Sequence, residues 1–333
     1  MEYKPKVLVT GPRMRPEVLA ALKKYCTVTQ WTASAVMPFE EFAKAAAVND
    51  VVVRAFRSPM ETREAEACRG HVKAVLQAFV GYEGVDIDAL TRCGIPFCNA
   101  ASPSSYTVAE MALTLILASQ RRLPASMEEV KDGTWTPGRN PVLGHNLMGR
   151  TAGIFGMGHI GGVLAGMLRA MGMTVLYYNR HPRTDDSRTG AVWTAEEELL
   201  KQSDIIINIL PASPATHHMM DLSFFRKMKR NALFVNVGRG DTVVTADLVQ
   251  ALREGIIGSA ALDVCDPEPV PPDHPLMAMD NVIVTPHMAS DTYEVVDMKV
   301  EEMIKNVFRA VRGEELTDCV NPEVYDREAE KVV

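Results

Sequence analysis

Three polar residues whose types suit acid–base chemistry follow apolar runs in the second half of the chain. Arg239 lies in NVGRG, Glu268 in LDVCDPEP and His287 in VTPHMAS. An imidazole can transfer a proton near neutral pH, a carboxylate beside it favours its charged form, and a guanidinium can pair with a substrate carboxylate. Each residue taken singly is more often structural or solvent-exposed. Their occurrence at three strand ends, where open parallel sheets carry functional groups, indicates catalysis.

A glycine pattern that suits nucleotide binding precedes these residues. Residues 151–180 read as strand, glycine turn, helix and strand, with three glycines in the spacing G-x-G-x-x-G. The first glycine permits a tight turn, the second lets the backbone approach a pyrophosphate, and the third lets the helix pack close to the sheet. The helix N-terminus adds free N–H groups and a partial positive charge. The residues expected to bind a dinucleotide here are Gly156, Met157, Gly158, His159, Ile160 and Gly161.

The elements that position these residues alternate between strand-like and helix-like segments. In the N-terminal part, strands are expected at 6–10, 27–31, 51–53, 72–78 and 96–98, with helices between them. In the second half, strands are expected at 151–155, 174–178, 205–210, 233–237, 259–264 and 282–285. Such alternation predicts parallel sheets covered by helices. The ends of two early strands single out Arg54 and Val80-Gly81 as candidate functional residues.

Two helices define the expected domain organisation. Residues 104–121 are apolar on almost every side, so we expect a buried helix at a domain junction, ended by Leu123-Pro124. Residues 292–312 form a long amphipathic pattern that is expected to return the chain to the first domain. At 333 residues the chain is long for one core. We therefore predict a substrate-binding domain of residues 1–101 and 291–333 and an NAD(P)-binding Rossmann domain of residues 102–290.

Composition limits the class of protein. A net charge of −7 without a basic run gives no support to nucleic-acid binding. The six cysteines lack C-x-x-C spacing, which fits reduced thiols and predicts neither a disulfide framework nor a metal site. The N-terminal sequence MEYKPKVLVTG enters a strand directly, and no apolar run reaches membrane-spanning length. We expect a cytoplasmic enzyme with no membrane partner.

Along essentially its whole length, the sequence resembles the D-isomer-specific 2-hydroxyacid dehydrogenase family. The resemblance rests on GMGHIG, TVAE at 107–110, LP at 210–211 with the following Thr216, NVGRGD, ALDVCDPEP, NVIVTPHMAS and the closing VNPEV. It implies two Rossmann-like or flavodoxin-like parallel-sheet domains, with the nucleotide domain inserted into a split substrate domain. It also implies that His287 is the general acid/base, Glu268 its partner and Arg239 the substrate anchor.

The same resemblance implies a wider set of binding residues. Main-chain N–H groups at Val80-Gly81 are expected to hold the substrate carboxylate, and Arg54, Arg239 and His287 complete the predicted substrate contacts. Asp263 and the backbone at Val237 and Gly238 are expected near the nicotinamide. The remaining predicted cofactor contacts are Leu210, Pro211 and Thr216. The family also suggests a homodimer.

The end of the second nucleotide-domain strand predicts the choice of cofactor. An acidic residue there would bind the ribose hydroxyls of NAD, but this strand ends in Asn179-Arg180, with no carboxylate before Asp185. Asn179 can donate a hydrogen bond and Arg180 can grip a 2′-phosphate. We therefore predict a preference for NADP(H), with Arg180 as the main determinant and Arg183 as a weaker one. The alternative is a solvated basic turn.

These observations predict an NAD(P)-dependent oxidoreductase acting on the CH–OH group of 2-hydroxy acids, chiefly as a glyoxylate/hydroxypyruvate reductase-like 2-keto acid reductase. One alternative is phosphoglycerate dehydrogenase-like oxidation, with Arg54 and Arg57 binding a phosphate; Arg57 could equally face solvent. Another is a nucleotide-sensing, corepressor-like interaction protein, because corepressors of this fold can retain the three polar residues. Trp135 could reach a pocket across a dimer or pack within its own loop.

Overall fold

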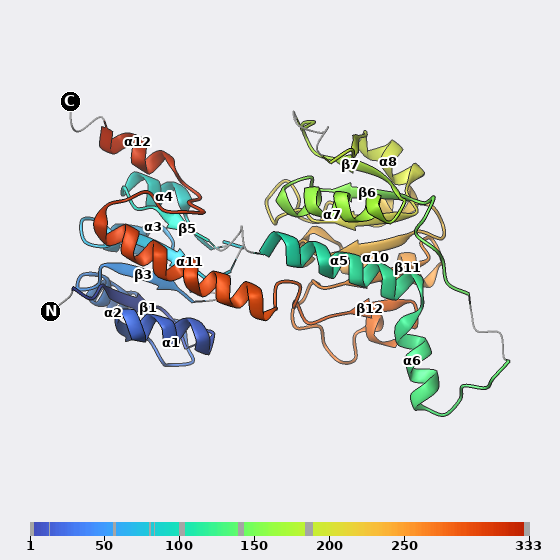
Figure 1. The fold of residues 1–333 in the computed structure, drawn as a ribbon, viewed down its shortest axis with the longest axis horizontal. Helices are drawn as coiled ribbons and strands as arrows, with labels where there is room; N and C mark the ends of the chain where they lie inside the picture. Colours follow the sequence, from blue (N-terminus) through green and yellow to red (C-terminus); the bar gives the residue numbers. More distant parts are fainter. Residues whose placement is uncertain are drawn as a thin grey trace. The chain divides into compact units, whose positions relative to one another are not determined.

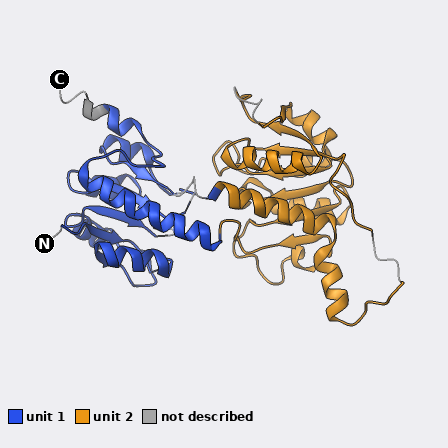
Figure 2. Cartoon of the chain, in the orientation of Figure 1, with its two compact units in different colours: residues 1–104, 291–333 blue, residues 105–290 orange. Residues whose placement is uncertain are grey.

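The computed structural model describes residues 3–12, 14–55, 58–79, 81–82, 84–99, 104–138, 143–183 and 189–329. The chain consists of parallel sheets with helices on both faces (Figure 1), and it divides into two compact units (Figure 2). Unit 1 contains Met1–Ser104 and Asp291–Val333, and unit 2 contains Ser105–Ser290. The predicted α/β fold class, with two parallel-sheet domains, is confirmed.

The sheet of unit 1 has five parallel strands in the order β2-β1-β3-β4-β5. This is the flavodoxin-like order, in which the direction of winding reverses between β1 and β3. The strands are β1 (Lys6–Val9), β2 (Thr27–Gln30), β3 (Val51–Arg54), β4 (Ala74–Gln77) and β5 (Phe97–Cys98). The helices are α1 (Pro16–Tyr25), α2 (Phe39–Ala46), α3 (Thr62–Cys68), α4 (Ile87–Arg92), α11 (Tyr293–Arg312) and α12 (Glu323–Ala329).

The strands of unit 1 are apolar on both faces because helices cover both faces. In β1, Val7 and Val9 pack into the cluster formed with α1 and α11, whereas Leu8 packs into the cluster formed with α2, α3 and α4. A near-continuous apolar strand is what a doubly covered parallel sheet requires. The amphipathic pattern of α11 is confirmed, but its buried face also contains Lys299 and Asn306, which the apolar periodicity did not predict.

The sheet of unit 2 has seven parallel strands in the order β12-β11-β10-β9-β6-β7-β8. The chain runs from β6 to one edge and then from β9 to the other, so β6 and β9 flank the switch point where such sheets bind nucleotides. The strands are β6 (Thr151–Phe155), β7 (Thr174–Tyr178), β8 (Val192–Trp193), β9 (Ile205–Asn208), β10 (Leu233–Asn236), β11 (Ser259–Leu262) and β12 (Val282–Val284). The helices are α5 (Ser105–Gln120), α6 (Leu123–Lys131), α7 (His159–Ala170), α8 (Glu196–Gln202), α9 (Leu222–Arg226) and α10 (Thr245–Arg253).

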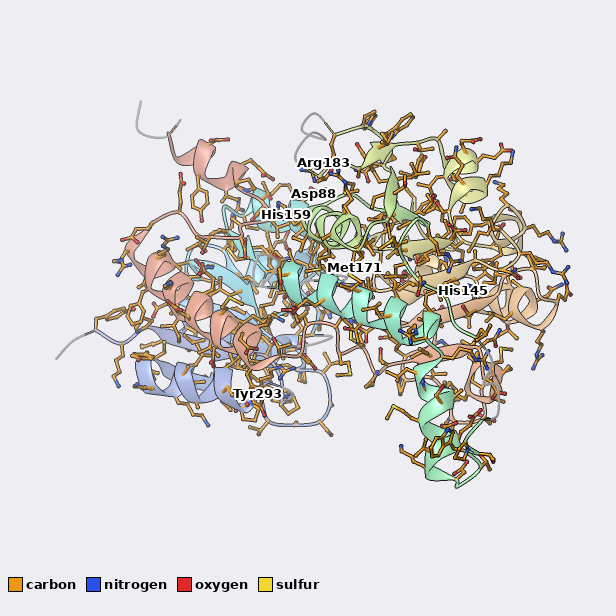
Figure 3. The ribbon with its side chains drawn as sticks, turned by 45° about the vertical axis from the view of Figure 1, so that its right-hand side comes forward. Asp88, His145, His159, Met171, Arg183 and Tyr293 are labelled. Carbon is orange, nitrogen blue, oxygen red and sulfur yellow. The ribbon has the colours of Figure 1, made fainter. Side chains whose placement is uncertain are left out.

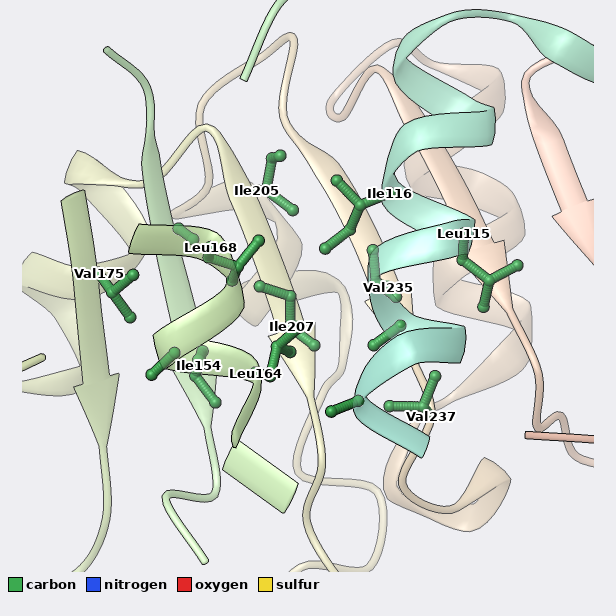
Figure 4. Close-up of a cluster of buried hydrophobic side chains, with 14 of the residues drawn as sticks. Leu115, Ile116, Ile154, Leu164, Leu168, Val175, Ile205, Ile207, Val235 and Val237 are labelled. Atoms are coloured by element: carbon green, nitrogen blue, oxygen red, sulfur yellow. The ribbon is translucent and has the colours of Figure 1, made fainter. Parts of the chain in front are cut away.

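Helices α5 and α7 pack on one face of the unit 2 sheet, and α8, α9 and α10 contribute to the cluster on the other face. In the close-up of Figure 4, Leu164 and Leu168 of α7 share one core with Ile207 of β9 and with Ile116 of α5. Ile206, one residue away along β9, packs into the opposite cluster. The apolar helix predicted at 104–121 is therefore a core helix of the nucleotide-type sheet.

The helix predicted at 104–121 ends before Leu123-Pro124, as expected, but a second helix that the sequence did not predict, α6, begins there. Arg122 takes a left-handed backbone conformation (φ 52°) that separates α5 from α6, and Pro124 occupies the first turn of α6, where an N–H has no helical partner. Trp135, in the loop after α6, is 62% exposed, which excludes buried packing within its own loop. Among the described residues, no helix combines the length and apolarity that crossing a bilayer requires.

Candidate active site

Loops at the carboxyl ends of β10, β11 and β12 carry Arg239, Glu268 and His287, and glycines let neighbouring loops touch. A Cβ on Gly238, after β10, would lie 2.6 Å from the carbonyl oxygen of Leu210, after β9. A Cβ on Gly240 would collide with the carbonyl group of Cys265, after β11. Only residues without side chains therefore let Arg239, between the two glycines, lie against both neighbouring loops.

A buried polar network holds the backbone at Arg239. Asn208 and Asn236 end β9 and β10 and lie opposite each other in the sheet register. The Asn208 amide donates to Asn236 Oδ1 (3.0 Å) and to Thr242 Oγ1 (2.7 Å). The Arg239 carbonyl accepts from both the Asn236 amide (3.1 Å) and the Thr242 hydroxyl (2.6 Å). Because buried polar groups are costly to leave without partners, the network fixes the path of this loop.

His287 and Glu268, predicted as the acid/base and its partner, lie side by side. His287 Nδ1 is 3.0 Å from Glu268 Oε2, and the other Glu268 oxygen accepts from the Cys265 N–H at 2.9 Å. The two side chains are 46% and 32% exposed, respectively. Because Nδ1 is engaged with the carboxylate, Nε2 is the ring atom that can exchange a proton with a substrate.

The pairing favours the charged forms of both groups. The hydrogen bond with Glu268 raises the pKa of His287 and outweighs the lowering caused by burial. The negative charge of Asp263 also raises this pKa. Burial would raise the pKa of Glu268, but its hydrogen bonds with His287 and the Cys265 N–H lower that pKa overall. The charge of Arg239 lowers the pKa of both groups, so its guanidinium lies within electrostatic reach of the pair.

The buried carboxylate of Asp263 organises the loop that carries His287. It accepts from the Thr285 hydroxyl (2.6 Å) and from the N–H groups of Met288 (3.0 Å) and Ala289 (2.9 Å). The Asp263 carbonyl also accepts from the His287 N–H at 2.9 Å. These bonds hold His287 at φ 53°, a left-handed conformation that non-glycine residues adopt only with support from their surroundings. The sequence did not predict this supporting role.

The pH dependence of reduction tests the His287–Glu268 pair. If protonated His287 gives the proton to the substrate, kcat/KM for reduction should be highest at low pH and fall as pH rises through the raised pKa of the ring. In Glu268→Gln, the carboxylate that stabilises the imidazolium is absent, so the fall should begin at lower pH. Steady-state pH profiles of both proteins measure this shift. Superimposable profiles would contradict the pairing, and Glu254→Gln, on an exposed position after α10, is a matched control.

The glycine turn after β6 has the features of a pyrophosphate cradle. Gly156 has φ 103°, and its Cβ position lies 3.1 Å from the backbone of Ile209 across the switch point. A Cβ on Gly161 would collide with the Gly156 carbonyl, so α7 packs directly on the turn. The Cβ position of Gly158 faces open space, and α7 begins at His159 without a side-chain cap. Its first N–H groups are therefore available to an anion, and the residues present fit a dinucleotide.

The residues after β7 differ in how they approach the glycine turn. The side-chain oxygen of Asn179 accepts from the Met157 N–H (2.8 Å), which leaves its NH₂ group as a donor. Arg183, predicted as the weaker phosphate contact, donates to the Met157 carbonyl at 3.0 Å. Figure 3 shows Arg183 and His159 at the same end of α7. Arg180 is exposed and makes no hydrogen bond or ion pair within the part of the chain that the structure describes.

The other predicted cofactor contacts follow β9 and β10. The hydroxyl of Thr216 donates to the Pro211 carbonyl (2.7 Å), which closes the segment after β9 into a compact loop. The N–H groups of Leu210 and Val237 both donate to Asn208, to its side chain (3.1 Å) and its carbonyl (3.1 Å) respectively. These residues lie at the carboxyl edge of the sheet, as does the glycine turn. Their contact with a cofactor stays a prediction.

In unit 1, Arg54 is only 2% exposed and orders a loop. Its Nη1 donates to Gln77 Oε1 (2.9 Å), and the Gln77 amide donates to the carbonyl of Gly81 (2.7 Å). The arginine therefore supports the segment that bears the predicted carboxylate-binding N–H groups. Substrate binding by Arg54 and Gly81 stays a prediction, and Val80 and Arg57 lie outside the described residues.

Comparison with known proteins identifies the family of the chain. Residues 113–289 match the family described as D-isomer specific 2-hydroxyacid dehydrogenase, NAD binding domain. The glyoxylate reductase of Korarchaeum cryptofilum is 34% identical over 325 residues, which cover 96% of this chain and 97% of that protein. The glyoxylate reductase/hydroxypyruvate reductase of Homo sapiens is 34% identical over 314 residues, which cover 93% of this chain and 95% of that protein.

A solved structure gives the same result. The NADPH-dependent glyoxylate/hydroxypyruvate reductase from Sinorhizobium meliloti, in complex with NADP and malonate, matches with a TM-score of 0.84 at 27% identity. The match covers 96% of this chain and 98% of that chain. With the sequence relatives, the chain therefore belongs to the D-isomer specific 2-hydroxyacid dehydrogenase family, as its motifs predicted.

Proposed function

We propose that this protein is a 2-keto acid reductase of the glyoxylate/hydroxypyruvate type, with His287 as the general acid, Glu268 as its partner and Arg239 as the substrate anchor. The observation that carries the proposal is the 3.0 Å contact between His287 and Glu268. This contact lies on loops at the edge of a sheet whose first strand ends in a dinucleotide-type glycine turn. The names of the relatives from Korarchaeum cryptofilum and Homo sapiens support the same substrate class.

Arg239, His287 and Glu268 have different roles in the proposed reduction of a 2-keto acid. A nicotinamide cofactor supplies the hydride when bound. The Arg239 guanidinium pairs with the substrate carboxylate and so orients the 2-keto group. As negative charge develops on the ketone oxygen, His287 Nε2 donates its proton to that oxygen, while Glu268 stabilises the imidazolium through Nδ1. The cofactor-binding set is Gly156, Met157, Gly158, His159, Ile160, Gly161, Asn179, Arg180, Leu210, Pro211, Thr216, Val237, Gly238 and Asp263.

We further propose that NADP(H) is preferred over NAD(H). The strand β7 ends without a carboxylate, and two arginines, Arg180 and Arg183, follow it. A carboxylate at that position would repel a 2′-phosphate, whereas a guanidinium attracts it. The Sinorhizobium meliloti reductase, named as NADPH-dependent, supports the same choice.

The decisive experiment is a panel of 2-keto acids assayed with NADH and NADPH. We expect turnover of glyoxylate and hydroxypyruvate at ordinary enzyme rates, about 1–10³ s⁻¹. Oxidation of a phosphorylated 2-hydroxy acid, without reduction of small 2-keto acids, would instead favour the phosphoglycerate dehydrogenase-like alternative. Nucleotide binding without turnover of any 2-keto acid would favour the corepressor-like alternative.

We also propose that the protein is a homodimer. Helix α6 has no buried residue, although several of its side chains are apolar. Leu123, Met127 and Val130 are 50%, 49% and 62% exposed. Trp135 adds an exposed indole just beyond the helix. The spacing of Leu123, Met127 and Val130 places them on one face of α6, and an exposed apolar helix face is typical of an interface. Light scattering should give twice the chain mass, and Val130→Glu should yield monomer; a parent protein that is monomeric would contradict the proposal.

A further inference from the structure

Two cysteines of unit 1 lie directly opposite each other. Cys98 ends β5, and Cys319 pairs with it in an isolated antiparallel bridge. The N–H of Val320 donates to the carbonyl of Phe97 (2.8 Å), so this hydrogen bond flanks the cysteine pair. The cysteines thus occupy a non-hydrogen-bonded pair, in which Cα atoms are about 4.5 Å apart and side chains approach most closely. That separation is within the range that a disulfide spans.

The segment that carries Cys319 is held firmly against β5. Asn321 is fully buried, and its side-chain oxygen accepts from the Phe97 N–H at 2.8 Å. Its amide donates to the Thr91 hydroxyl and to the Ile95 carbonyl, both at 3.0 Å. The proximity of the two thiols is therefore built into the packing of unit 1, because the residues on both sides of the pair are fixed.

The two thiols differ in exposure and in acidity. Cys98 is 2% exposed, whereas Cys319 is partly exposed. A hydrogen bond to Cys319 and burial raise the pKa of Cys98, and the same hydrogen bond lowers the pKa of Cys319. Asp318 and Glu302 add negative charge that further disfavours a Cys98 thiolate. Cys319 is therefore the attacking thiol and Cys98 the resolving thiol.

We propose that Cys98 and Cys319 form a redox-active dithiol that closes to an intramolecular disulfide by exchange with small-molecule disulfides. The Cys319 thiolate attacks one sulfur of oxidised glutathione, forming a mixed disulfide and releasing one glutathione thiolate. The Cys98 sulfur then attacks Sγ of Cys319, which releases the second glutathione. The two thiol protons and two electrons of the protein end on two molecules of reduced glutathione. The bond ties the C-terminal segment of the chain to β5 and leaves the proposed catalytic residues untouched.

Peptide mapping of the native protein tests this site. Wild-type protein is equilibrated with excess oxidised glutathione, quenched in acid, alkylated and digested without reduction. We expect a linked peptide pair containing Cys98 and Cys319, lost on treatment with a dithiol reductant, with unchanged far-ultraviolet circular dichroism before quenching. Independent alkylation of the two cysteines, or a link between Cys68 and Cys93 in its place, would overturn the proposal.

Variants separate the two steps. Cys98→Ser should accumulate one glutathione on Cys319, because the mixed disulfide cannot be resolved. Cys319→Ser should leave Cys98 unmodified. Cys98 is buried, and in this variant no mixed disulfide forms at position 319 for it to attack. Cys93→Ser, which changes another partly exposed cysteine, is the matched control and should retain the linked peptides. Equal glutathione incorporation at Cys98 and Cys319 in the two single variants would contradict the assigned order.

Discussion

Replacing His287 with alanine is expected to lower kcat for 2-keto acid reduction by about 10²–10⁴-fold, the usual contribution of a positioned general acid. The imidazole is the group that Glu268 contacts at 3.0 Å, and this hydrogen bond raises the pKa of His287, so the substitution removes the proposed proton donor. Nucleotide affinity should change little, because the glycine turn is formed by β6 and α7 and does not depend on this ring. Single-turnover reduction and a separate nucleotide titration measure the two effects.

A histidine elsewhere in unit 2 provides the control for this variant. His145, labelled in Figure 3, is exposed, and its backbone N–H donates to the carbonyl of Gln120 at the end of α5 (2.9 Å). His145→Ala should therefore keep parental kcat. Near-parental activity of His287→Ala would remove the proposed acid, and a loss in His145→Ala or His218→Ala would move the role to that residue.

The loops that carry Arg239, Glu268 and His287 show which features a sequence can predict. The apolar runs predicted every strand of unit 1 and six of the seven strands of unit 2, because a buried parallel strand needs an apolar run. They missed β8, a two-residue edge strand whose residues are both exposed. Glu268 and His287 were expected to meet, and they do. Both were recognisable from their residue types, because a carboxylate beside an imidazole is a common arrangement for proton transfer.

The supporting residues could not be read in the same way. Asp263 holds three groups of the His287 loop only because that loop turns through a left-handed residue, and no periodicity encodes such a turn. Asn208 and Asn236 are adjacent only through the register of β9 with β10. Their position inside the two apolar runs at 205–210 and 233–237 was a visible signal, since a buried asparagine needs hydrogen-bond partners.

Cofactor choice is the second large expected effect, and we expect it to depend on the two arginines that follow β7. A charge-assisted hydrogen bond contributes about 1.5–3 kcal/mol, which corresponds to roughly ten- to a hundredfold in affinity. Arg180 is exposed and not engaged by described residues, so its guanidinium can turn to a 2′-phosphate. Arg183 already donates to the Met157 carbonyl, within the glycine turn that is proposed to bind the pyrophosphate common to both cofactors.

The two arginines should therefore give different results when removed. Arg180→Ala is expected to weaken NADP⁺ binding by about ten- to a hundredfold and to leave NAD⁺ binding nearly unchanged, because only NADP⁺ carries the phosphate. Arg183→Ala is expected to weaken the binding of both nucleotides, because it also removes the Met157 contact.

Isothermal titration with each nucleotide measures affinity directly, and kcat/KM with NADPH and NADH measures the same preference in turnover. Arg226→Ala, an exposed arginine at the end of α9, controls for the loss of one positive charge. If the parent uses NADH and NADPH equally, or if Arg180→Ala keeps full NADP⁺ affinity, the residues after β7 do not read the phosphate.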